Sequence, residues 1–97
     1  MNSKDRRDAV NLAQALTRGA SWRELWAILE GLKDQNAESI RHVVRDYVTK
    51  VVLNTESEKR AAAGMKILDE FSQPWDQADG ITPVVLAVGR IVLPSPR

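Results

Sequence analysis

His42 and Glu38 are the first candidates for chemistry, because they stand one helical turn apart and could share a metal ion. His42 is the only histidine, and the chain has no cysteine, so thiolate ligands and disulfide bonds are excluded. A pair of ligands is fewer than the three or four that a zinc site takes from a protein. We therefore expect a structural or solvated role for His42 and no bound metal.

Other catalytic arrangements lack one of their parts. A catalytic serine needs a histidine base that an acid orients, and the candidate serines have no such partners at a plausible position in the chain. These serines are Ser21, Ser57 and Ser72. The carboxylate pairs Asp69 with Glu70 and Asp76 with Asp79 could act as acid and base, but among 13 acidic residues such pairs arise by chance. The five glycines are too scattered for a phosphate loop, so we predict that the chain is not an enzyme and binds no cofactor.

Basic residues raise the question of nucleic-acid binding. The chain has 14 lysines and arginines against 13 acidic residues, a net charge of +1, which is weak support for a protein whose affinity depends on neutralising phosphates. A phosphate-contacting face could be formed by Lys4, Arg6, Arg7, Arg41, Arg45, Lys59 and Arg60. Interleaved acids such as Asp5, Asp8 and Asp46 favour ordinary solvated helix faces instead. We expect the three tryptophans, at positions 22, 26 and 75, to be core and turn anchors rather than stacking platforms.

Helix start and stop signals recur along the first three quarters of the chain and predict four helices. The first covers about residues 4–18 and ends at Gly19, which lacks the side chain that penalises a left-handed cap. The expected starts of the next three are Ser21 with Glu24, Asp34 or Asn36, and Thr55 with Glu58. The third helix runs to about Leu53, and Pro74 stops the fourth. Apolar residues recur at helical spacing, and we expect in the core Ala9, Leu12, Ala13, Leu16, Trp22, Leu25, Trp26, Leu29, Leu32, Ile40, Val43, Val44, Tyr47, Val48, Val51, Ala61, Met65, Leu68 and Phe71.

The stretch "GITPVVLAVGRIVLPSP", residues 80–96, is strand-like by composition, yet we predict a helix. Thr82 is a suitable N-cap, Pro83 suits a first helical turn, and Pro94 ends the segment. No other segment resembles a strand, so a single strand here would have no hydrogen-bonding partner. The predicted fold is all-α, a compact bundle of about five helices in one domain spanning residues 1–97, and no apolar run is long enough to cross a membrane.

The last helix has more apolar surface than one buried side requires. Leu86 and Leu93 lie opposite its main stripe, close to Arg90, and Leu53 forms a similar surplus at the end of the third helix. Two interpretations remain open. Either this helix is central and surrounded by its own domain, or its second side is an oligomerisation surface.

The helix order and the stretches "ESIRHVVRDYVTKVVL" and "ILDEFSQPWDQADGITPVVLAVGRIVL" resemble the C-terminal collar domain of AAA+ clamp-loader subunits, the replication factor C-like ATPases of cells and phages. The likeness covers roughly residues 7–93. It includes an acid–aromatic–x–x–Pro–aromatic turn, formed here by Glu70, Phe71, Pro74 and Trp75.

The resemblance implies a non-catalytic oligomerisation module that holds ATPase subunits in a ring while a sliding clamp is loaded during DNA replication. The implied partners are other clamp-loader subunits, in a homo- or hetero-oligomeric ring; DNA and the clamp would be met only through the full complex, in the cytoplasm. Because the phosphate loop and arginine finger of the family are missing, we expect a C-terminal fragment of a longer ATPase subunit or a stand-alone relative. The interface role falls on Leu53, Leu86, Arg90 and Leu93. The alternative is a small helical adaptor or DNA-binding domain of another replication or phage protein.

Overall fold

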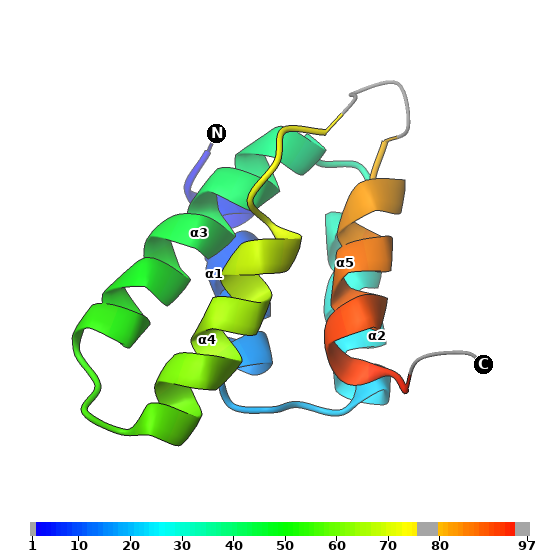
Figure 1. Ribbon diagram of the computed structural model, residues 1–97. Helices are drawn as coiled ribbons and strands as arrows, with labels where there is room; N and C mark the ends of the chain where they lie inside the picture. Colours follow the sequence, from blue (N-terminus) through cyan, green and yellow to red (C-terminus); the bar gives the residue numbers. More distant parts are fainter. Residues whose placement is uncertain (1, 76–79, 95–97) are drawn as a thin grey trace.

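The computed structural model describes residues 2–75 and 80–94, and helices make up most of them (Figure 1). The helices are α1 Ser3–Thr17, α2 Trp22–Leu32, α3 Ala37–Leu53, α4 Glu58–Glu70 and α5 Thr82–Val92. The two described ranges contain no strand, so the predicted all-α class is confirmed, including the helical state of the apolar last segment. Within the same residues, no helix combines the length and the apolar character needed to cross a lipid bilayer.

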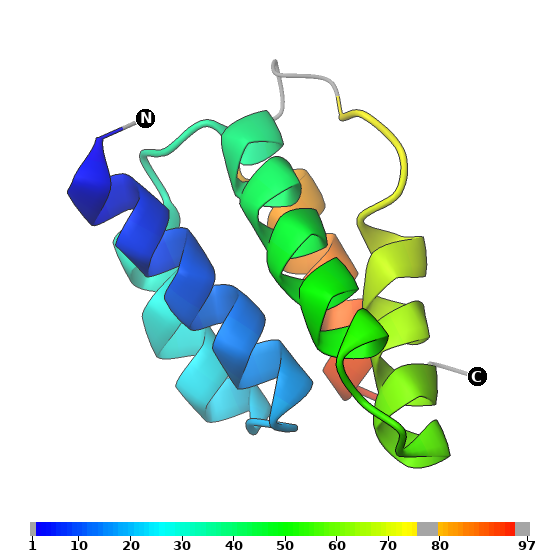
Figure 2. The same cartoon turned by 90° about the vertical axis from the view of Figure 1, so that its left-hand side faces the viewer.

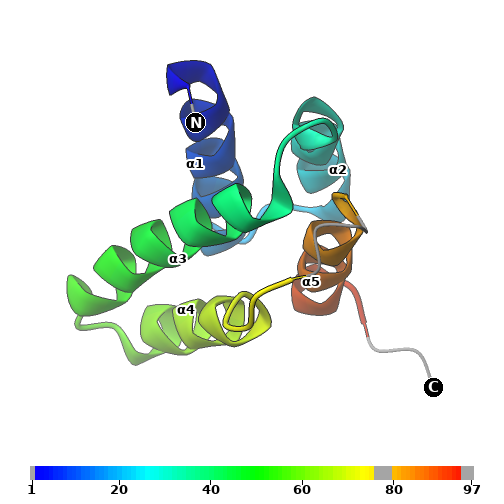
Figure 3. The same cartoon turned by 90° about the horizontal axis from the view of Figure 1, so that it is seen from above.

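Three helix pairs form the larger part of the packing: α1 with α3, α1 with α2, and α3 with α4. α3 lies between α1 and α4 and contacts both, and α1 also packs on α2 (Figures 1 and 2). α5 contacts α2, α3 and α4 at one edge of the molecule (Figure 3). The largest fully buried side chains come from every helix or its cap and are Phe71, Leu12, Leu25, Leu32, Ile40, Ile67, Val44, Val48, Val84 and Val88. α5 is thus fixed to the core along one side, by Val84, Ala87 and Val88.

The turn between α1 and α2 has the predicted glycine cap. Gly19 has a φ of 75°, in the left-handed region that glycine adopts without strain. The backbone N–H of Ala20 donates to the carbonyl of Ala15 at 3.0 Å, and that of Gly19 donates to Leu16 at 3.3 Å. These two bonds form a Schellman motif, which satisfies carbonyls that the helix end leaves free.

Two of the predicted N-caps are confirmed. Ser21 Oγ accepts the backbone N–H of Glu24 at 3.3 Å, and Asn36 Oδ1 accepts the N–H three residues ahead at 3.0 Å. The second bond shows that Asn36, and not Asp34, caps α3. The Glu24 carboxylate does not complete the capping box, because it binds the Arg18 guanidinium at 2.8 Å instead.

The other two predicted caps are wrong. Ser57, not Thr55, caps α4: its hydroxyl accepts the N–H three residues ahead at 3.2 Å, while Thr55 Oγ1 accepts the Ser57 N–H at 3.1 Å and so orders the preceding turn. Thr82 is the first helical residue of α5 rather than its cap. The helix begins one residue earlier than predicted because the Ile81 carbonyl already accepts the N–H of Val85 at 3.2 Å.

Two residues that the pattern assigned to the core lie on the surface. Trp26 is 52% exposed and Met65 is 56% exposed. Each lies at the edge of its stripe, roughly 100° around the helix from a buried neighbour in the preceding position. On α4 the buried positions are Gly64 and Ile67, which the prediction did not include.

Candidate subunit interface

α5 lies at the edge of the fold, so its second apolar side faces outward. Leu86 is 51% exposed and Leu93 is 45% exposed. The interpretation of this helix as central and fully surrounded is therefore wrong. The structure leaves these leucines accessible to another molecule, which the alternative interpretation required.

The outward side of α5 forms a groove with α2. One hollow, of about 370 Å³, is lined by Trp22, Val85, Leu86, Gly89, Arg90, Leu93 and Pro94. A second hollow, of about 310 Å³, is lined by Trp22, Trp26, Leu29, Glu30, Lys33, Ile81 and Val85. The hollows share Trp22 and Val85 and are therefore adjacent, and together we name them the α2–α5 groove. Three of the four predicted interface residues, Leu86, Arg90 and Leu93, lie together in it.

The groove combines apolar walls with few charges. Within residues 2–75 and 80–94, no carboxylate lies within ion-pair distance of Arg90, whereas Lys33 is paired with Glu30 at 3.9 Å. A surface of this kind can bury apolar side chains of a partner and offer one guanidinium to a carboxylate. Each leucine that becomes fully buried contributes roughly 1.5–3 kcal/mol, and these two, already half covered, contribute about half of that.

Leu53, the fourth predicted interface residue, lies elsewhere. It is the last residue of α3 and, at 79%, the most exposed of the large hydrophobic residues in the described chain. Figures 1 and 3 show the α3–α4 connection and α5 on opposite sides of the molecule. The structure therefore separates Leu53 from the other three residues, and they cannot contact the same patch of one partner molecule.

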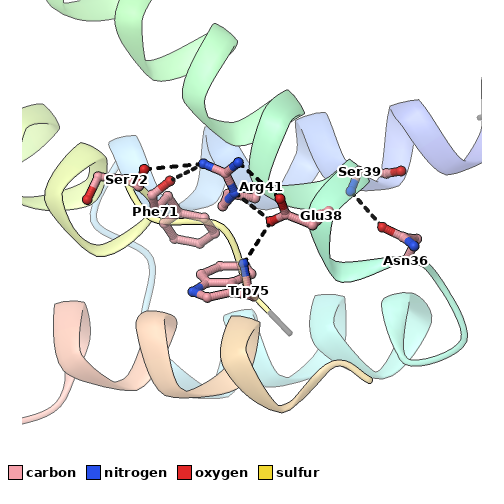
Figure 4. Close-up of polar contacts among 7 residues, drawn as sticks. All are labelled: Asn36, Glu38, Ser39, Arg41, Phe71, Ser72 and Trp75. Atoms are coloured by element: carbon pink, nitrogen blue, oxygen red, sulfur yellow. Dashed lines mark hydrogen bonds and ion pairs between the residues drawn. The ribbon is translucent and has the colours of Figure 1, made fainter. Parts of the chain in front are cut away.

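A buried ion pair within α3, which the sequence analysis did not predict, is hydrogen-bonded to the backbone at the end of α4 and in the turn that follows (Figure 4). Arg41 Nε donates to Glu38 Oε2 at 2.6 Å and Nη2 donates to Oε1 at 3.0 Å, so the pair is bidentate. Arg41 Nη1 donates to the carbonyls of Phe71 and Ser72 at 3.3 and 3.4 Å, and Glu38 Oε2 accepts the Trp75 backbone N–H at 3.2 Å. We name this set of bonds the Glu38–Arg41 tie.

The tie favours the charged form of Glu38. The hydrogen bond from the Arg41 side chain lowers the pKa of the Glu38 carboxyl, opposed by burial and assisted by the Trp75 N–H and the positive charge of Arg41. Glu38 is therefore an ionised acceptor at neutral pH and not a proton donor. It is also committed to Arg41 rather than to His42, which is exposed. No group of three or more potential metal ligands occurs in the described residues.

The tie holds the turn on which the collar resemblance depends. Phe71 is fully buried, and its ring centroid lies 5.3 Å from that of Trp75 with the planes tilted by 59°. Both residues are bonded to the tie through their backbones. One signal in the sequence could have revealed the ion pair. Arg41 lies in the inward stripe of α3, between Ala37 and Val44, where a charge needs a partner. Arg41 is only 4% exposed, so it is wrong as a candidate phosphate contact.

The remaining candidates do not converge on a site. Ser21 and Ser57 are helix caps, and the Ser72 hydroxyl donates to the Asp69 carbonyl at 2.8 Å. Asp69 is exposed and Glu70 is half-buried, while Asp76 and Asp79 lie outside the described residues. The basic candidates other than Arg41 are exposed and distributed over α1, α3 and α4.

Comparisons of the chain with protein-family models, curated proteins and solved structures give no significant match. The resemblance to clamp-loader collars therefore remains a prediction from the sequence. Three features of the structure bear on function: the α2–α5 groove, the exposed Leu53 and the Glu38–Arg41 tie.

Proposed function

We propose that this chain is a non-catalytic oligomerisation module that binds neighbouring subunits through the α2–α5 groove. The observation that carries the proposal is the outward apolar side of α5, where Leu86 and Leu93 are half exposed beside the ring of Trp22. A continuous exposed apolar surface costs solubility unless a partner covers it, and in proteins such surfaces usually mark interaction sites.

The more specific form of the proposal is the collar of a sliding-clamp loader. In that role the module holds AAA+ ATPase subunits in a ring during DNA replication, and it meets the clamp and DNA only as part of the full complex. Two features support this assignment: the order of the helices, and the turn that contains Phe71, Pro74 and Trp75, which the Glu38–Arg41 tie holds against α3. A P-loop ATPase encoded in the same reading frame ahead of Met1 would support it further.

The test uses the natural gene product, tagged and expressed in its own host. We expect stoichiometric co-purification of ATPase subunits that contain a P-loop, and loss of these subunits when Leu86 and Leu93 are both changed to Ser. Met65→Ser is the matched control, because Met65 is as exposed as Leu86 but lies outside the groove. Recovery of a complex without any P-loop ATPase would contradict the collar assignment. Equal recovery from both variants would contradict the role of the groove.

The alternative, a small helical DNA-binding or adaptor domain, has less support from the structure. Arg41 is removed from the basic set because it is buried and paired. The exposed basic residues that remain are distributed over α1, α3 and α4, and the net charge of the chain is only +1.

A further inference from the structure

α5 differs from the other four helices in what holds it in place. We propose that α5 opens from the molecule as a separate unit while α1–α4 stay folded, and that a subunit bound in the α2–α5 groove keeps it closed. The second part rests on the proposed function. Such a device requires a helix with little stability of its own, a contact that can open alone, and a fixed point at which the rest of the fold ends.

α5 has little helical stability of its own. Six of its 11 residues are β-branched and Gly89 lies in its interior, and both kinds of residue lower the propensity for a helix. α1, α2, α3 and α4 each begin at a side chain that accepts a backbone N–H, whereas α5 is the one helix of the described chain without such a cap. An isolated helix of this length is marginal in water, so α5 is helical because it packs on its neighbours.

The contact that holds α5 is one-sided. Its buried residues are two valines and one alanine, and its opposite side is half exposed. Among the side-chain hydrogen bonds of residues 2–75 and 80–94, a single one joins α5 to another helix: Lys66 Nζ donates to the Ile91 carbonyl at 3.1 Å. The three most extensive helix contacts, α1 with α3, α1 with α2 and α3 with α4, do not involve α5. All three remain when α5 leaves.

The Glu38–Arg41 tie fixes the chain up to Trp75 to α3. Arg41 donates to the carbonyls of Phe71 and Ser72. Glu38 accepts the Trp75 N–H, so the turn after α4 is bonded to α3 at three points, and none of them lies in α5. α4 itself buries few residues, but the fully buried Phe71 at its end and the tie keep it with α1–α3. Opening of α5 therefore breaks none of the ion pairs described for residues 2–75 and 80–94.

The α2–α5 groove is complete only while α5 is closed. Its lining comes from α2 and from α5 with the residues at its two ends, so neither helix forms the groove alone. A subunit that binds the complete groove binds the closed state and not the open one, and by mass action it stabilises the closed state. Binding of a subunit and closure of α5 are therefore coupled.

Hydrogen exchange followed by NMR on the whole chain measures the opening. Amides in the middle of α5 should exchange at least tenfold faster than those of Val44 and Val48 in α3, after correction for intrinsic rates. Equal rates would mean that α5 leaves only when the whole fold unfolds. That result would overturn the separate opening and leave the groove as the proposed interface.

Two matched variants provide an independent test. Ser57→Ala weakens α4, which stays folded when α5 opens, so it should speed exchange in α3 about fivefold and leave exchange in α5 unchanged. Val88→Ala weakens the contact between α5 and the other helices, so it should speed exchange in both helices by the same factor, roughly tenfold or more. Circular dichroism establishes that both variants are folded. Faster exchange of α5 in Ser57→Ala would overturn the separate opening.

The purified complex tests the coupling to subunit binding. Hydrogen exchange followed by mass spectrometry should show peptides from α5 exchanging at least tenfold more slowly in the complex than in the isolated chain. Unchanged exchange of α5 in the complex would overturn the coupling and contradict the groove as the interface. The opening of α5 in the isolated chain would still stand, because it is measured without a partner.

Discussion

Replacing Arg41 by Met removes the charge of the Glu38–Arg41 tie while keeping a side chain of similar length in the core. The substitution leaves Glu38 without its bidentate partner and the carbonyls of Phe71 and Ser72 without their donor. Breaking a buried ion pair costs about 3–5 kcal/mol, because the remaining charge is left uncompensated. The Glu38 side chain is 19% exposed and keeps some hydration, so we expect the lower end, about 3 kcal/mol.

The assay is urea denaturation followed by circular dichroism at neutral pH. A domain of this size has about 5–15 kcal/mol of stability, so the variant should remain folded with a lower midpoint. Glu38→Gln and the double variant complete a cycle with Arg41→Met, and the double variant should be less destabilised than the sum of the two single ones. Additive effects, or an unchanged midpoint in Arg41→Met, would refute the view that the tie stabilises the fold.

The same tie predicts a pH dependence whose sign follows from Glu38. Its pKa is lowered in the folded protein from an ordinary value of 4.5, so the folded state binds this proton less readily than the unfolded state does. The stabilisation from Glu38 is therefore fully present above about pH 4.5 and is lost as the pH falls through the lower, folded pKa. Denaturation midpoints measured below pH 4.5 should fall further in the wild type than in Glu38→Gln. Parallel pH curves for the two proteins would contradict this assignment.

Three further outcomes are expected. Ser57→Ala should lower the free energy of unfolding by about 1 kcal/mol and Thr55→Ala by less, because only Ser57 caps α4. Equal urea midpoints for the two variants would contradict Ser57 as the cap. Gly64→Ala should cost about 1–3 kcal/mol, because the added Cβ collides with Val52 Cγ2, and Val52→Ala in the same chain should recover part of that loss. The isolated chain should show no sub-micromolar binding to primed DNA near 150 mM salt in fluorescence anisotropy, since its net charge is only +1.

The helices were predictable because their boundaries depend on hydrogen bonds between residues that are close together in the sequence. Gly19, Ser21 and Asn36 act through backbone bonds to residues a few positions away, so the sequence contains both partners. The start of α4 was misplaced because Thr55 and Ser57 are both good caps, and the capping-box spacing of Thr55 with Glu58 favoured the wrong one.

The site was predictable only in part, for a geometric reason. A helical wheel identifies Leu86 and Leu93 as lying opposite the buried stripe of α5, and the structure confirms that they are exposed. The wheel does not contain α2, so Trp22 and Trp26 were assigned to the core rather than to the groove. A wheel of one helix also gives no information on positions in other helices, so it could not show that Leu53 lies far from Leu86, Arg90 and Leu93.

Arg41 and Arg90 show how one sequence feature can indicate either an internal bond or an external one. Both arginines stand among apolar residues of a helix, where a charge requires a partner. Arg41 has an acid three residues before it, and in the structure Glu38 satisfies it. Arg90 has Leu86 and Ala87 one turn before it and Leu93 and Pro94 one turn after it, so its own helix offers no carboxylate. Its helix is also at the edge of the fold, in a groove whose apolar walls strengthen any ion pair that a partner completes there. The first arginine therefore stabilises the domain, and the second lies on the surface that we propose as the contact with a neighbouring subunit.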